Sequence, residues 1–416
     1  MAEQPSEQRH QGWSPHTLVT ETGQLELVEA VLDDLALRHQ RVPGGPASGV
    51  AEPSGPPGAT GPPPAPDRLG LTRLDLTDGD FRPLEDIDGV LEEVRRRIAA
   101  RHGGWLPALG KDRQAISTVI SGGNPKPTAA VFHPQPVEIS GGNPKPTAGA
   151  EQPEPVSAAA LPASASTAAA SGRTVRIGLV DTPASDLAAP GEVWTAHSTF
   201  VRSIVTAAAP AAEIRARSVL NGERGTGALW DVATAMLELV HEEEVEILLL
   251  PLACFTADGR PPLLLDRALR LAGKRTLIIA AAGNQTLQAG WTSLGRGRSS
   301  PAWPGAHDRV KAIGTVFTLD DESQAAGQEP TQPWVDALTT RSVFVGPFFT
   351  GPVDLGDGTV QEFTGAARWR GTSFCAAHAA GLVAARMEDG PTAEEAWQSL
   401  LDEGTELRRP AVPGLE

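Results

Sequence analysis

Three segments of the chain place an acid, an imidazole and a hydroxyl where a strand ends or a helix begins. The run Val175–Asp181 predicts a buried strand that ends on a carboxylate. His197 stands at the start of a predicted helix, and Ser373 at the start of another that is rich in small residues. In open α/β sheets functional groups gather at the carboxyl ends of strands, and these three side chains suit acid–base and nucleophilic chemistry. Each residue alone also has an ordinary explanation, as a turn former, a structural histidine or an N-cap.

The elements that must position these residues alternate between strand and helix after residue 173. The predicted strands are Val175–Val180, Val245–Leu250, Thr276–Ala281 and Val310–Val316. The predicted helices are Thr199–Ala208, Ala228–Glu243, Leu264–Ala272 and Ser373–Met387, and a capping box at Thr392-Ala-Glu-Glu395 opens one more. Short apolar strands separated by helices indicate a parallel sheet that is covered on both faces.

The order of the segments is more specific than any one of them. Ala281-Ala-Gly-Asn284 follows a predicted strand between the histidine and serine segments, and Gly371-Thr-Ser373 opens the last of them. This order resembles the subtilisin-like serine proteases (subtilases), which carry Asp, His and Ser in that order with an oxyanion Asn before the Ser. The resemblance covers about residues 174–404. It implies an α/β, subtilisin-like fold with a mostly parallel central sheet and helices on both faces.

The resemblance also implies a role for each of the four residues. Ser373 would be the nucleophile, His197 the base that takes its proton, and Asp181 the carboxylate that fixes the imidazole tautomer. Asn284 would donate its side-chain amide to the tetrahedral oxyanion. We therefore expect a serine endopeptidase that works through an acyl-enzyme and acts on protein or peptide substrates.

Several positions depart from the family pattern, although none removes an atom of the triad. The departures are Pro183 where the family has Gly, Phe200 where it has His, Arg202 where it has Ala, Ser203 where it has Gly, and Ala377 where it has Pro. They mark a divergent member. They also leave an alternative open, a catalytically inactive subtilase-fold protein that binds peptides or acts as a scaffold.

By the same resemblance, a substrate peptide would add as a strand between two edges of the chain. The edges are Gly225-Thr-Gly227 and Leu250–Cys254, and the expected substrate-binding residues are Gly225, Gly227, Leu252 and Ala253. Pro251 has no N–H to donate, and Ala253 stands where the family has Gly. We therefore expect the primary pocket to favour small or slender side chains.

Composition limits the remaining classes of function. The 416 residues include 35 Lys and Arg against 51 Asp and Glu, and the net charge of −16 argues against nucleic-acid binding. The chain has no Tyr, so a tyrosine acid or base is excluded. No apolar run approaches the ~20 residues of a membrane span, and no signal peptide is visible. A cytoplasmic protein without membrane or nucleic-acid partners is expected.

No cofactor is expected from the polar residues outside the triad. His307 and His378 match no metal-ligand spacing, and no Asp-x-Asp-x-Asp-Gly loop is present. Many subtilases bind calcium, so the resemblance leaves calcium open without locating a site. The two cysteines, Cys254 and Cys375, cannot form a disulfide framework. Cys375 lies two residues from Ser373, but on a small-residue helix we expect it to be buried packing.

The part of the chain before residue 173 divides by composition. The expected units are a helical segment at 1–42, a disordered linker at 43–66, a small α+β segment at 67–118, a disordered linker at 119–172, the catalytic domain at 173–404 and a tail at 405–416. The elements expected in the first units are a helix at Leu25–Leu37, a strand at Arg68–Leu76 and a helix at Ile87–Ile98. The α+β segment suits either a propeptide that inhibits the enzyme or, with the residues before it, a partner-docking module (residues 1–118).

The second linker contains a duplication. The segment Ile-Ser-Gly-Gly-Asn-Pro-Lys-Pro-Thr-Ala occupies residues 120–129 and again residues 139–148. Two copies are too few for a solenoid, so they are either a duplicated spacer or a repeated recognition or cleavage segment. We expect the enzyme to cut its own chain between about Ser117 and Arg173, because Pro/Ala-rich extended backbone fits a cleft that accepts strands.

Overall fold

The computed structural model describes residues 16–42, 65–80, 82, 84, 87–117, 152–161, 173–184, 187, 191, 193–221, 225–256, 259–284, 301–315, 333–355 and 359–410. Both copies of the duplication lie outside these residues, as do residues 43–64 of the first predicted linker and residues 411–416 of the predicted tail.

Residues 16–42 and 65–117 build one small unit, called the front unit below. Its elements are β1 (Thr17–Glu21), α1 (Leu25–Asp34), β2 (Arg38–Val42), α2 (Ala65–Arg68), β3 (Leu71–Thr77), α3 (Ile87–Arg101) and β4 (Leu109–Lys111). The strands form an antiparallel sheet in the order β2-β3-β1-β4. Val28 and Leu32 of α1 pack with Val94 and Ile98 of α3 in its core, as the helical spacing predicts.

The pairing of β1 with β3 corrects the predicted division of this part of the chain. Residues 16–42 are not a separate helical segment, because two of their strands belong to the same sheet as β3. A sheet needs three or more strands and a covering layer to be stable. The stretch that follows Arg68 supplies only two strands of this sheet, β3 and β4, so it requires β1 and β2 to complete the layer.

Residues 173–410, which include the predicted catalytic domain and are called the catalytic body below after that prediction, are built on a seven-stranded sheet. Its order is β18 (Leu407–Arg408), β15 (Ala337–Thr339), β14 (Lys311–Thr315), β12 (Leu277–Ala281), β10 (Ile247–Leu250), β7 (Arg176–Asp181) and β8 (Glu213–Ser218). All strands are parallel except β18, which is antiparallel to β15. Strands β10 and β12 are buried at every position, as expected for a parallel sheet with both faces covered. The predicted boundary at residue 404 is therefore wrong, because β18 extends the sheet beyond it.

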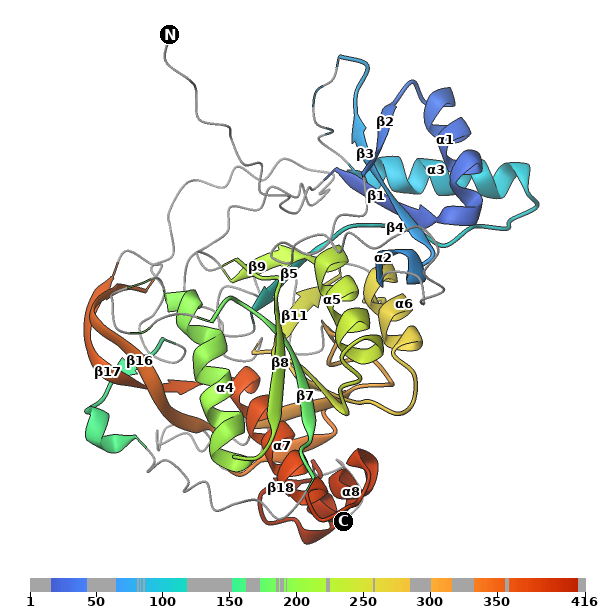
Figure 1. Cartoon of the computed structure of the whole chain (residues 1–416). Coiled ribbons are helices and arrows are strands. Elements are labelled where there is room, and N and C mark those ends of the chain that lie inside the picture. The colour runs from blue at the N-terminus through green and yellow to red at the C-terminus, as the bar shows by residue number, and fades with distance from the viewer. Residues whose placement is uncertain are drawn as a thin grey trace, which may run out of the picture.

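Helices cover both faces of this sheet (Figure 1). On one face lie α4 (His197–Ala208) and α7 (Thr372–Met387), and α8 (Ala393–Glu403) packs against α7. On the other lie α5 (Leu229–His241) and α6 (Leu263–Leu271). A Cβ added to Gly381 of α7 would stand 2.7 Å from the Ala208 Cβ, so the small residues of α7 permit a close approach to α4. The predicted fold class, α/β with a mostly parallel sheet between helices, is confirmed, and Thr392 and Glu395 form the predicted capping box of α8.

Two smaller sheets join the parts of the molecule. The first, in the order β13-β11-β5-β9, consists of β13 (Ala302–Trp303), β11 (Leu252–Phe255), β5 (Gln114–Ser117) and β9 (Thr226–Ala228). The second is a long hairpin of β16 (Val343–Asp354) and β17 (Val360–Arg370), to which β6 (Glu154–Pro155) adds. Part of the predicted linker at 119–172 is thus ordered on the catalytic body, because β6 pairs with β17 and a 3₁₀ turn at Ala158–Ala160 follows it.

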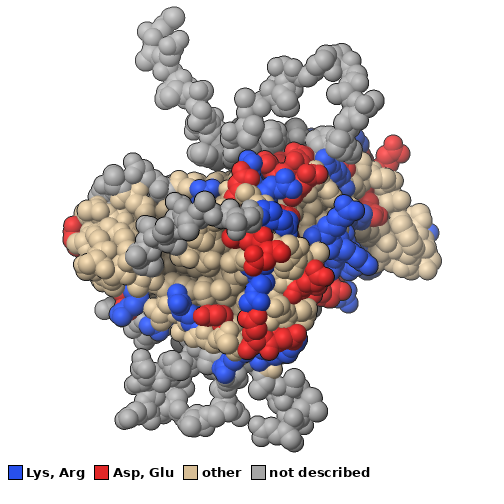
Figure 2. Space-filling model, turned by 60° about the horizontal axis from the view of Figure 1, so that its bottom comes forward, with Lys and Arg blue, Asp and Glu red and all other residues tan. Residues whose placement is uncertain are grey.

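The front unit lies over the α5–α6 side of the catalytic body, and the β16–β17 hairpin projects at the opposite side (Figure 1). Acidic and basic side chains lie next to one another on the face drawn in Figure 2 rather than in separate patches. None of the described helices is long and apolar enough to cross a membrane.

Candidate active site

The carboxylate of Asp181 and the imidazole of His197 form a buried pair. Asp181 is the last residue of β7, and His197 is the first residue of α4. The two carboxylate oxygens lie 2.8 and 2.9 Å from Nδ1 of His197, and the two residues are only 1 % and 0 % exposed. Because the carboxylate accepts a hydrogen bond from Nδ1–H, a neutral ring presents Nε2 as a base. Among the described residues, this Nε2 atom has no hydrogen-bond partner.

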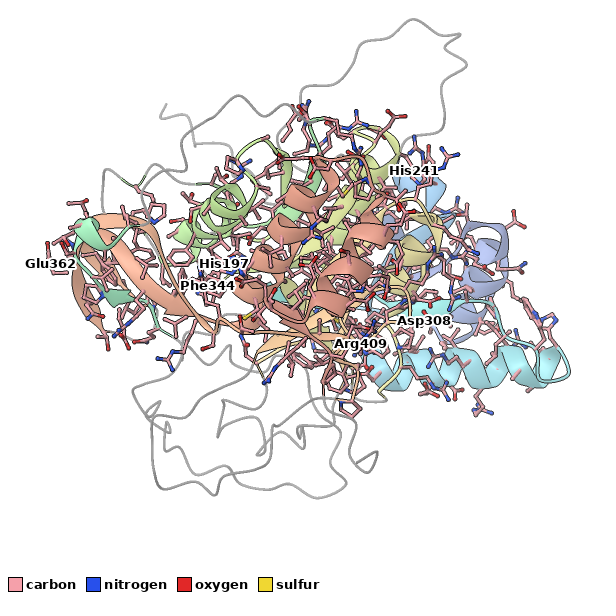
Figure 3. All side chains as sticks on the ribbon, turned by 90° about the horizontal axis from the view of Figure 1, so that it is seen from below. His197, His241, Asp308, Phe344, Glu362 and Arg409 are labelled. Atoms are coloured by element: carbon pink, nitrogen blue, oxygen red, sulfur yellow. The ribbon has the colours of Figure 1, made fainter. Side chains whose placement is uncertain are left out.

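Three aromatic rings surround the His197 imidazole. Their centroids lie 6.3 Å (Trp194), 6.0 Å (Trp369) and 5.4 Å (Phe374) from the centroid of the imidazole. Figure 3 shows His197 inside the body, whereas Glu362 lies far out on the β16–β17 hairpin. Apolar walls exclude water, and the low local dielectric strengthens the hydrogen bonds between Asp181 and His197.

One of the departures from the family pattern, Phe200, belongs to this aromatic cluster. The centroid of its ring lies 4.8 Å from that of Phe374 and 5.5 Å from that of Trp369. Phe200 therefore fills an apolar space with these rings, and Asp181 and His197 stay paired.

Ser373 lies in the first turn of α7, which meets the residues that follow β10 and β12: Ser373 contacts Pro251, and Thr372 contacts Gly283 and Asn284. Gly371, the N-cap of α7, has φ +156°, a conformation that L side chains rarely adopt, which accounts for glycine at this entry to the helix. The hydroxyl of Ser373 donates to the carbonyl of Pro251 at 2.9 Å, and the residue is fully buried. Phe374, the next residue along the helix, has its ring centroid 5.4 Å from that of the His197 imidazole, so the first turn of α7 packs beside this histidine.

Asn284 follows β12 and is tied to the residue before the serine. Its Oδ1 accepts hydrogen bonds from the backbone N–H and the hydroxyl of Thr372, both at 3.0 Å. The Thr372 hydroxyl in turn accepts from the N–H of Gly283 at 3.2 Å. With Oδ1 engaged by two donors, the amide can offer only its Nδ2–H₂ to a further acceptor. That is the polarity that an oxyanion donor requires.

The expected peptide-binding edges hold a strand of the chain itself. β5 pairs antiparallel with β9 on one side and with β11 on the other. Gly227 lies opposite Ala115, and a Cβ on Gly227 would stand 2.2 Å from the Val219 carbonyl, which explains glycine there. Leu252 and Ala253 lie opposite Ser117 and Ile116. The space between β9 and β11 that β5 occupies is called the slot below. Three of the four expected residues, Gly227, Leu252 and Ala253, therefore line the slot.

The fourth expected residue, Gly225, does not pair with β5. It precedes β9 in a turn with φ +61°, and its N–H donates to the Asn221 carbonyl at 3.0 Å. In this structure it forms the turn that leads into β9, and its expected contact with a substrate peptide stays a prediction.

Asp112 and Arg113, just before β5, accept hydrogen bonds from the start of α5, and this contact is called the clasp below. The Arg113 carbonyl accepts from Leu229 N–H at 2.8 Å, and the carboxylate of Asp112 accepts from Trp230 N–H at 3.2 Å. The first amides of a helix have no partner within it, so these two bonds cap α5 with groups from the front unit. The guanidinium of Arg73, on β3, lies 4.5 Å from the centroid of the Trp230 ring and 3.9 Å from Asp112.

Burial dominates the electrostatics of this contact. Asp112 is 3 % exposed, and burial raises the pKa of its carboxyl to about 7 despite the opposing effects of Arg73 and the Trp230 N–H. Burial also raises the pKa of Asp231, the next residue of α5, although Arg73 opposes this shift. Burial lowers the pKa of Arg73, against the favourable charges of Asp112 and Asp231. The joint between the two parts thus contains charges whose burial costs free energy.

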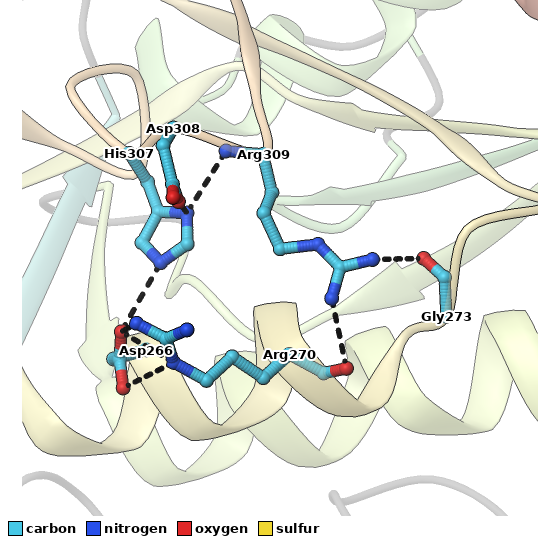
Figure 4. A network of polar contacts seen from close by, with 6 residues as sticks. All are labelled: Asp266, Arg270, Gly273, His307, Asp308 and Arg309. Carbon is cyan, nitrogen blue, oxygen red and sulfur yellow. Dashed lines mark hydrogen bonds and ion pairs between the residues drawn. The ribbon is translucent and has the colours of Figure 1, made fainter.

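His307 and His378, the two histidines weighed as metal ligands in the sequence, have structural surroundings. Figure 4 shows His307 between α6 and the turn before β14, where its Nε2 lies 3.2 Å from Asp266 and its Nδ1 accepts from the Arg309 N–H at 3.2 Å. His378 lies 3.4 Å from Glu406, and burial is the largest cause that lowers its pKa. No group of three or more His, Cys, Asp or Glu side chains in the described part of the chain could hold a metal ion.

Both cysteines are buried, and neither forms a disulfide. Cys375 is fully buried, and its Sγ faces the Arg341 carbonyl at 3.8 Å, which agrees with a packing role. Cys254 lies on β11, the strand that backs β5.

The sequence expectations omitted Trp194, Trp369 and Asp112. Closeness in sequence could have suggested the two Trp residues as neighbours of the site, since Trp194 stands three residues before His197 and Trp369 four residues before Ser373. Asp112 precedes a strand that pairs across more than 100 residues, so its neighbours could not be inferred from local pattern.

No family model and no curated protein sequence matches the chain. Among solved structures, it is similar to a lanthipeptide protease (16 % identity over 57 % of this chain and 82 % of that chain, TM-score 0.42). It is also similar to the prenylagaramide maturation protease PagA (20 %, 58 % and 86 %, TM-score 0.42) and to the patellamide maturation protease PatA (19 %, 56 % and 87 %, TM-score 0.39). At these values the similarity concerns the arrangement of strands and helices and does not identify a reaction.

Proposed function

We propose that the chain is a serine endopeptidase with Ser373 as nucleophile, His197 as general base and Asp181 as the orienting carboxylate. The observation that supports this most directly is the buried Asp181–His197 pair, whose Nε2 atom has no partner among the described residues. A buried nitrogen without a hydrogen-bond partner costs free energy. Nε2 of His197 is such a nitrogen, and it lies next to the helix that carries Ser373, an arrangement suited to proton transfer.

The reaction would begin when the Ser373 hydroxyl turns from the Pro251 carbonyl toward His197. Oγ attacks the carbonyl carbon of the scissile bond while Nε2 of His197 takes the hydroxyl proton. The C–N bond then breaks, the departing amine takes that proton, and the acyl group remains on Oγ. A water molecule, deprotonated by the same Nε2, hydrolyses the acyl-enzyme and restores the serine.

Charge that develops during attack would fall on the carbonyl oxygen. The Nδ2 group of Asn284, held by the two hydrogen bonds from Thr372 to its Oδ1, is the proposed side-chain donor. The N–H of Ser373 is the proposed backbone donor, and the N-terminal end of α7 adds a positive partial charge. One such donor is worth roughly 10²–10³ in turnover in a comparable site.

We also propose that the front unit restrains this activity and that the enzyme processes its own chain beyond β5. Support comes from β5, which fills the slot between β9 and β11 as a peptide substrate would. The clasp of Asp112 and Arg113 on α5 holds it there. A protease whose slot is occupied by its own N-terminal part is inactive toward other chains until that part leaves.

A second candidate is a peptide-binding protein without catalysis. It is favoured by the bond from the Ser373 hydroxyl to the Pro251 carbonyl rather than to His197. In that reading the partner-docking part would be residues 1–118, and the slot would hold β5 permanently.

Labelling with a fluorophosphonate probe separates the two candidates, because only a serine activated by a base reacts. We would label the whole chain, Ser373→Ala, and Ala115→Glu, in which a charge on the buried face of β5 opens the slot. We expect a single adduct that disappears with Ser373→Ala and increases with Ala115→Glu. If neither the native chain nor the opened variant takes up the probe, the enzyme proposal is wrong.

A further inference from the structure

The first turn of α4 is capped by a residue from another part of the chain. Ala196, which precedes the helix, makes no side-chain cap. Instead, the N–H of Ser198 donates to the hydroxyl oxygen of Thr182 at 3.3 Å. Both residues are only 1 % exposed, so water has little access to this bond. The acceptor that a helix start often takes from its own N-cap residue is thus supplied by the residue that follows β7.

Thr182 also contacts the carboxylate of the buried pair. Its backbone N–H donates to Oδ1 of Asp181 at 2.7 Å, and the same oxygen lies 2.8 Å from Nδ1 of His197. Since His197 and Ser198 are the first two residues of α4, Thr182 touches both halves of the pair. Its main chain holds the carboxylate, and its side chain holds the helix that carries the imidazole.

The residue after Thr182 restricts the backbone from which both bonds are made. Pro183 is exposed and stands where the family has Gly. A proline disfavours the helical region for the residue before it and keeps that residue extended. A glycine would impose no such restriction. This departure from the family pattern therefore narrows the conformations that are open to Thr182.

Close apolar packing fixes the middle and the end of α4. A Cβ added to Gly346 of β16 would stand 2.9 Å from the ring of Phe200, and one added to Gly381 of α7 would stand 2.7 Å from the Cβ of Ala208. Apolar contacts hold a helix against its neighbours but are not directional. The bond to Thr182 is directional, and it acts on the turn that carries His197.

We propose that Thr182 is a positioning residue whose hydroxyl holds the first turn of α4. In that position Nδ1 of His197 meets the Asp181 carboxylate, and Nε2 stays available for proton transfer. This role rests on the proposed endopeptidase function, but Thr182 itself touches no reacting atom. Without the hydroxyl, the buried N–H of Ser198 loses this acceptor, and the turn shifts toward another one. A misplacement of about 1 Å can cost roughly 100-fold in rate.

Two substitutions of Thr182 separate the hydroxyl from the size of the side chain. Thr182→Val removes the hydroxyl at nearly constant size, whereas Thr182→Ser keeps it. We expect the rate of fluorophosphonate labelling at Ser373 to fall at least about tenfold in Thr182→Val and to stay within about threefold in Thr182→Ser. Should Thr182→Val fail to fold, Thr182→Ala takes its place, because it removes the same hydroxyl and adds no bulk.

Thr392→Val is the matched control. Thr392 caps α8 through the same kind of bond, which the Glu395 N–H donates to its hydroxyl, also at 3.3 Å. The substitution is identical, but α8 carries none of the predicted site residues. Thr392→Val should therefore lower thermal stability, as the loss of a cap does, and leave the labelling rate unchanged.

A second readout does not require catalysis. In the Ser373→Ala chain, proton NMR of the His197 Nδ1–H measures how fast this proton exchanges with water, which depends on its hydrogen bond to Asp181. We expect Thr182→Val to speed this exchange at least about tenfold. In Thr182→Ser and Thr392→Val the exchange should stay within about twofold of its rate in the Ser373→Ala chain.

Two results would overturn the positioning role. One is a Thr182→Val chain that is labelled as fast as the native chain, and the other is an Nδ1–H exchange rate that Thr182→Val leaves unchanged. The two readouts also keep this proposal apart from the proposed function. A native chain that takes up no probe contradicts the endopeptidase, whereas the exchange of the His197 proton still decides whether Thr182 positions the pair.

Discussion

The part of the chain before residue 173 touches the catalytic body at two places that differ in depth. At the first, β5 lies between β9 and β11, Ala115 is fully buried, and Asp112 is 3 % exposed. At the second, β6 lies along β17, and the ion pair of Glu154 with Arg368 is about half exposed on both sides. The first contact is therefore buried from solvent, as in a protein interior, whereas the second contact is exposed at the surface.

The difference indicates which contact controls the slot. Opening the first contact separates a strand from partners on both sides and exposes the apolar surface around Ala115. Opening the second breaks the backbone pairing of two residues and polar contacts that water can replace. We expect β5 to determine whether the site is accessible, whereas β6 only guides the chain back toward β7.

Hydrogen exchange measures this difference without requiring catalysis. In the Ser373→Ala chain, which the proposed mechanism leaves uncut, protection of the β5 and β6 amides reports the local opening equilibrium of each contact. Each variant described next is made in this Ser373→Ala chain.

The largest effect is expected from a charge placed inside the first contact. Ala115→Glu would bury an unpaired carboxylate among apolar residues, which costs several kcal/mol. Protection of the β5 amides should therefore fall by at least about 100-fold, as measured by hydrogen exchange with mass spectrometry. The matched control is Ala159→Glu, in the exposed 3₁₀ turn after β6, which should change protection less than about twofold. Equal losses at the two places would contradict the comparison.

The next effect concerns the clasp on α5. Asp112→Ala removes the cap on Trp230 N–H and the carboxylate nearest to Arg73. Truncating one member of a buried charged pair costs about 2–5 kcal/mol, so we expect β5 protection to fall about 30-fold or more. Asp88→Ala is the control. It removes the exposed ion-pair partner of Lys111, the residue next to Asp112, and should change β5 protection little. A clasp that matters only for local helix stability would instead reduce protection of α5 and leave β5 unchanged.

The same carboxylate gives the first contact a pH dependence. In the closed state the pKa of Asp112 is about 7, and in the open state it returns toward its ordinary value near 3.9. Closing therefore takes up a proton, so the contact tightens as the pH falls below 7 and loses this stabilisation as the pH rises through 7. Asp231 of α5 shifts in the same direction, and Arg73 of β3 opposes both.

Between pH 8 and pH 6, β5 protection corrected for intrinsic exchange should rise about tenfold. Asp112→Asn should flatten this profile, whereas β6 protection should not follow it in either chain. An unchanged slope in Asp112→Asn would assign the pH dependence to another group.

The sequence predicted the catalytic body better than the connections to it. The candidate site could be predicted from the order of Asp181, His197, Asn284 and Ser373 because each residue stands at or next to a local element, a strand end or a helix start. The four predicted strands β7, β10, β12 and β14 are present for the same reason, since buried apolar runs are visible locally.

What the sequence did not predict depends on long-range pairing. The strands β1 and β2 join β3 across the first predicted linker, β5 pairs with β9 and β11, and β18 closes the far edge of the central sheet. Short strands of two to five residues carry too little periodicity to reveal a partner far along the chain. The direction of the Ser373 hydroxyl, toward Pro251 rather than His197, is likewise a property of the folded site.

The smallest effect is expected at the second contact. Glu154→Gln keeps the size of the side chain and removes the charge that pairs with the Arg368 guanidinium, whose Nε lies 2.9 Å from Glu154 Oε2. Exposed pairs of this kind contribute about 0–1 kcal/mol, so β6 protection should fall less than about fivefold and β5 protection should not change. Arg368→Gln should have the same small effect, and the double variant should lose no more than either single one. If Glu154→Gln opened β5 as well, the two contacts would be coupled through residues 118–151, and the slot would be controlled from both ends of that segment.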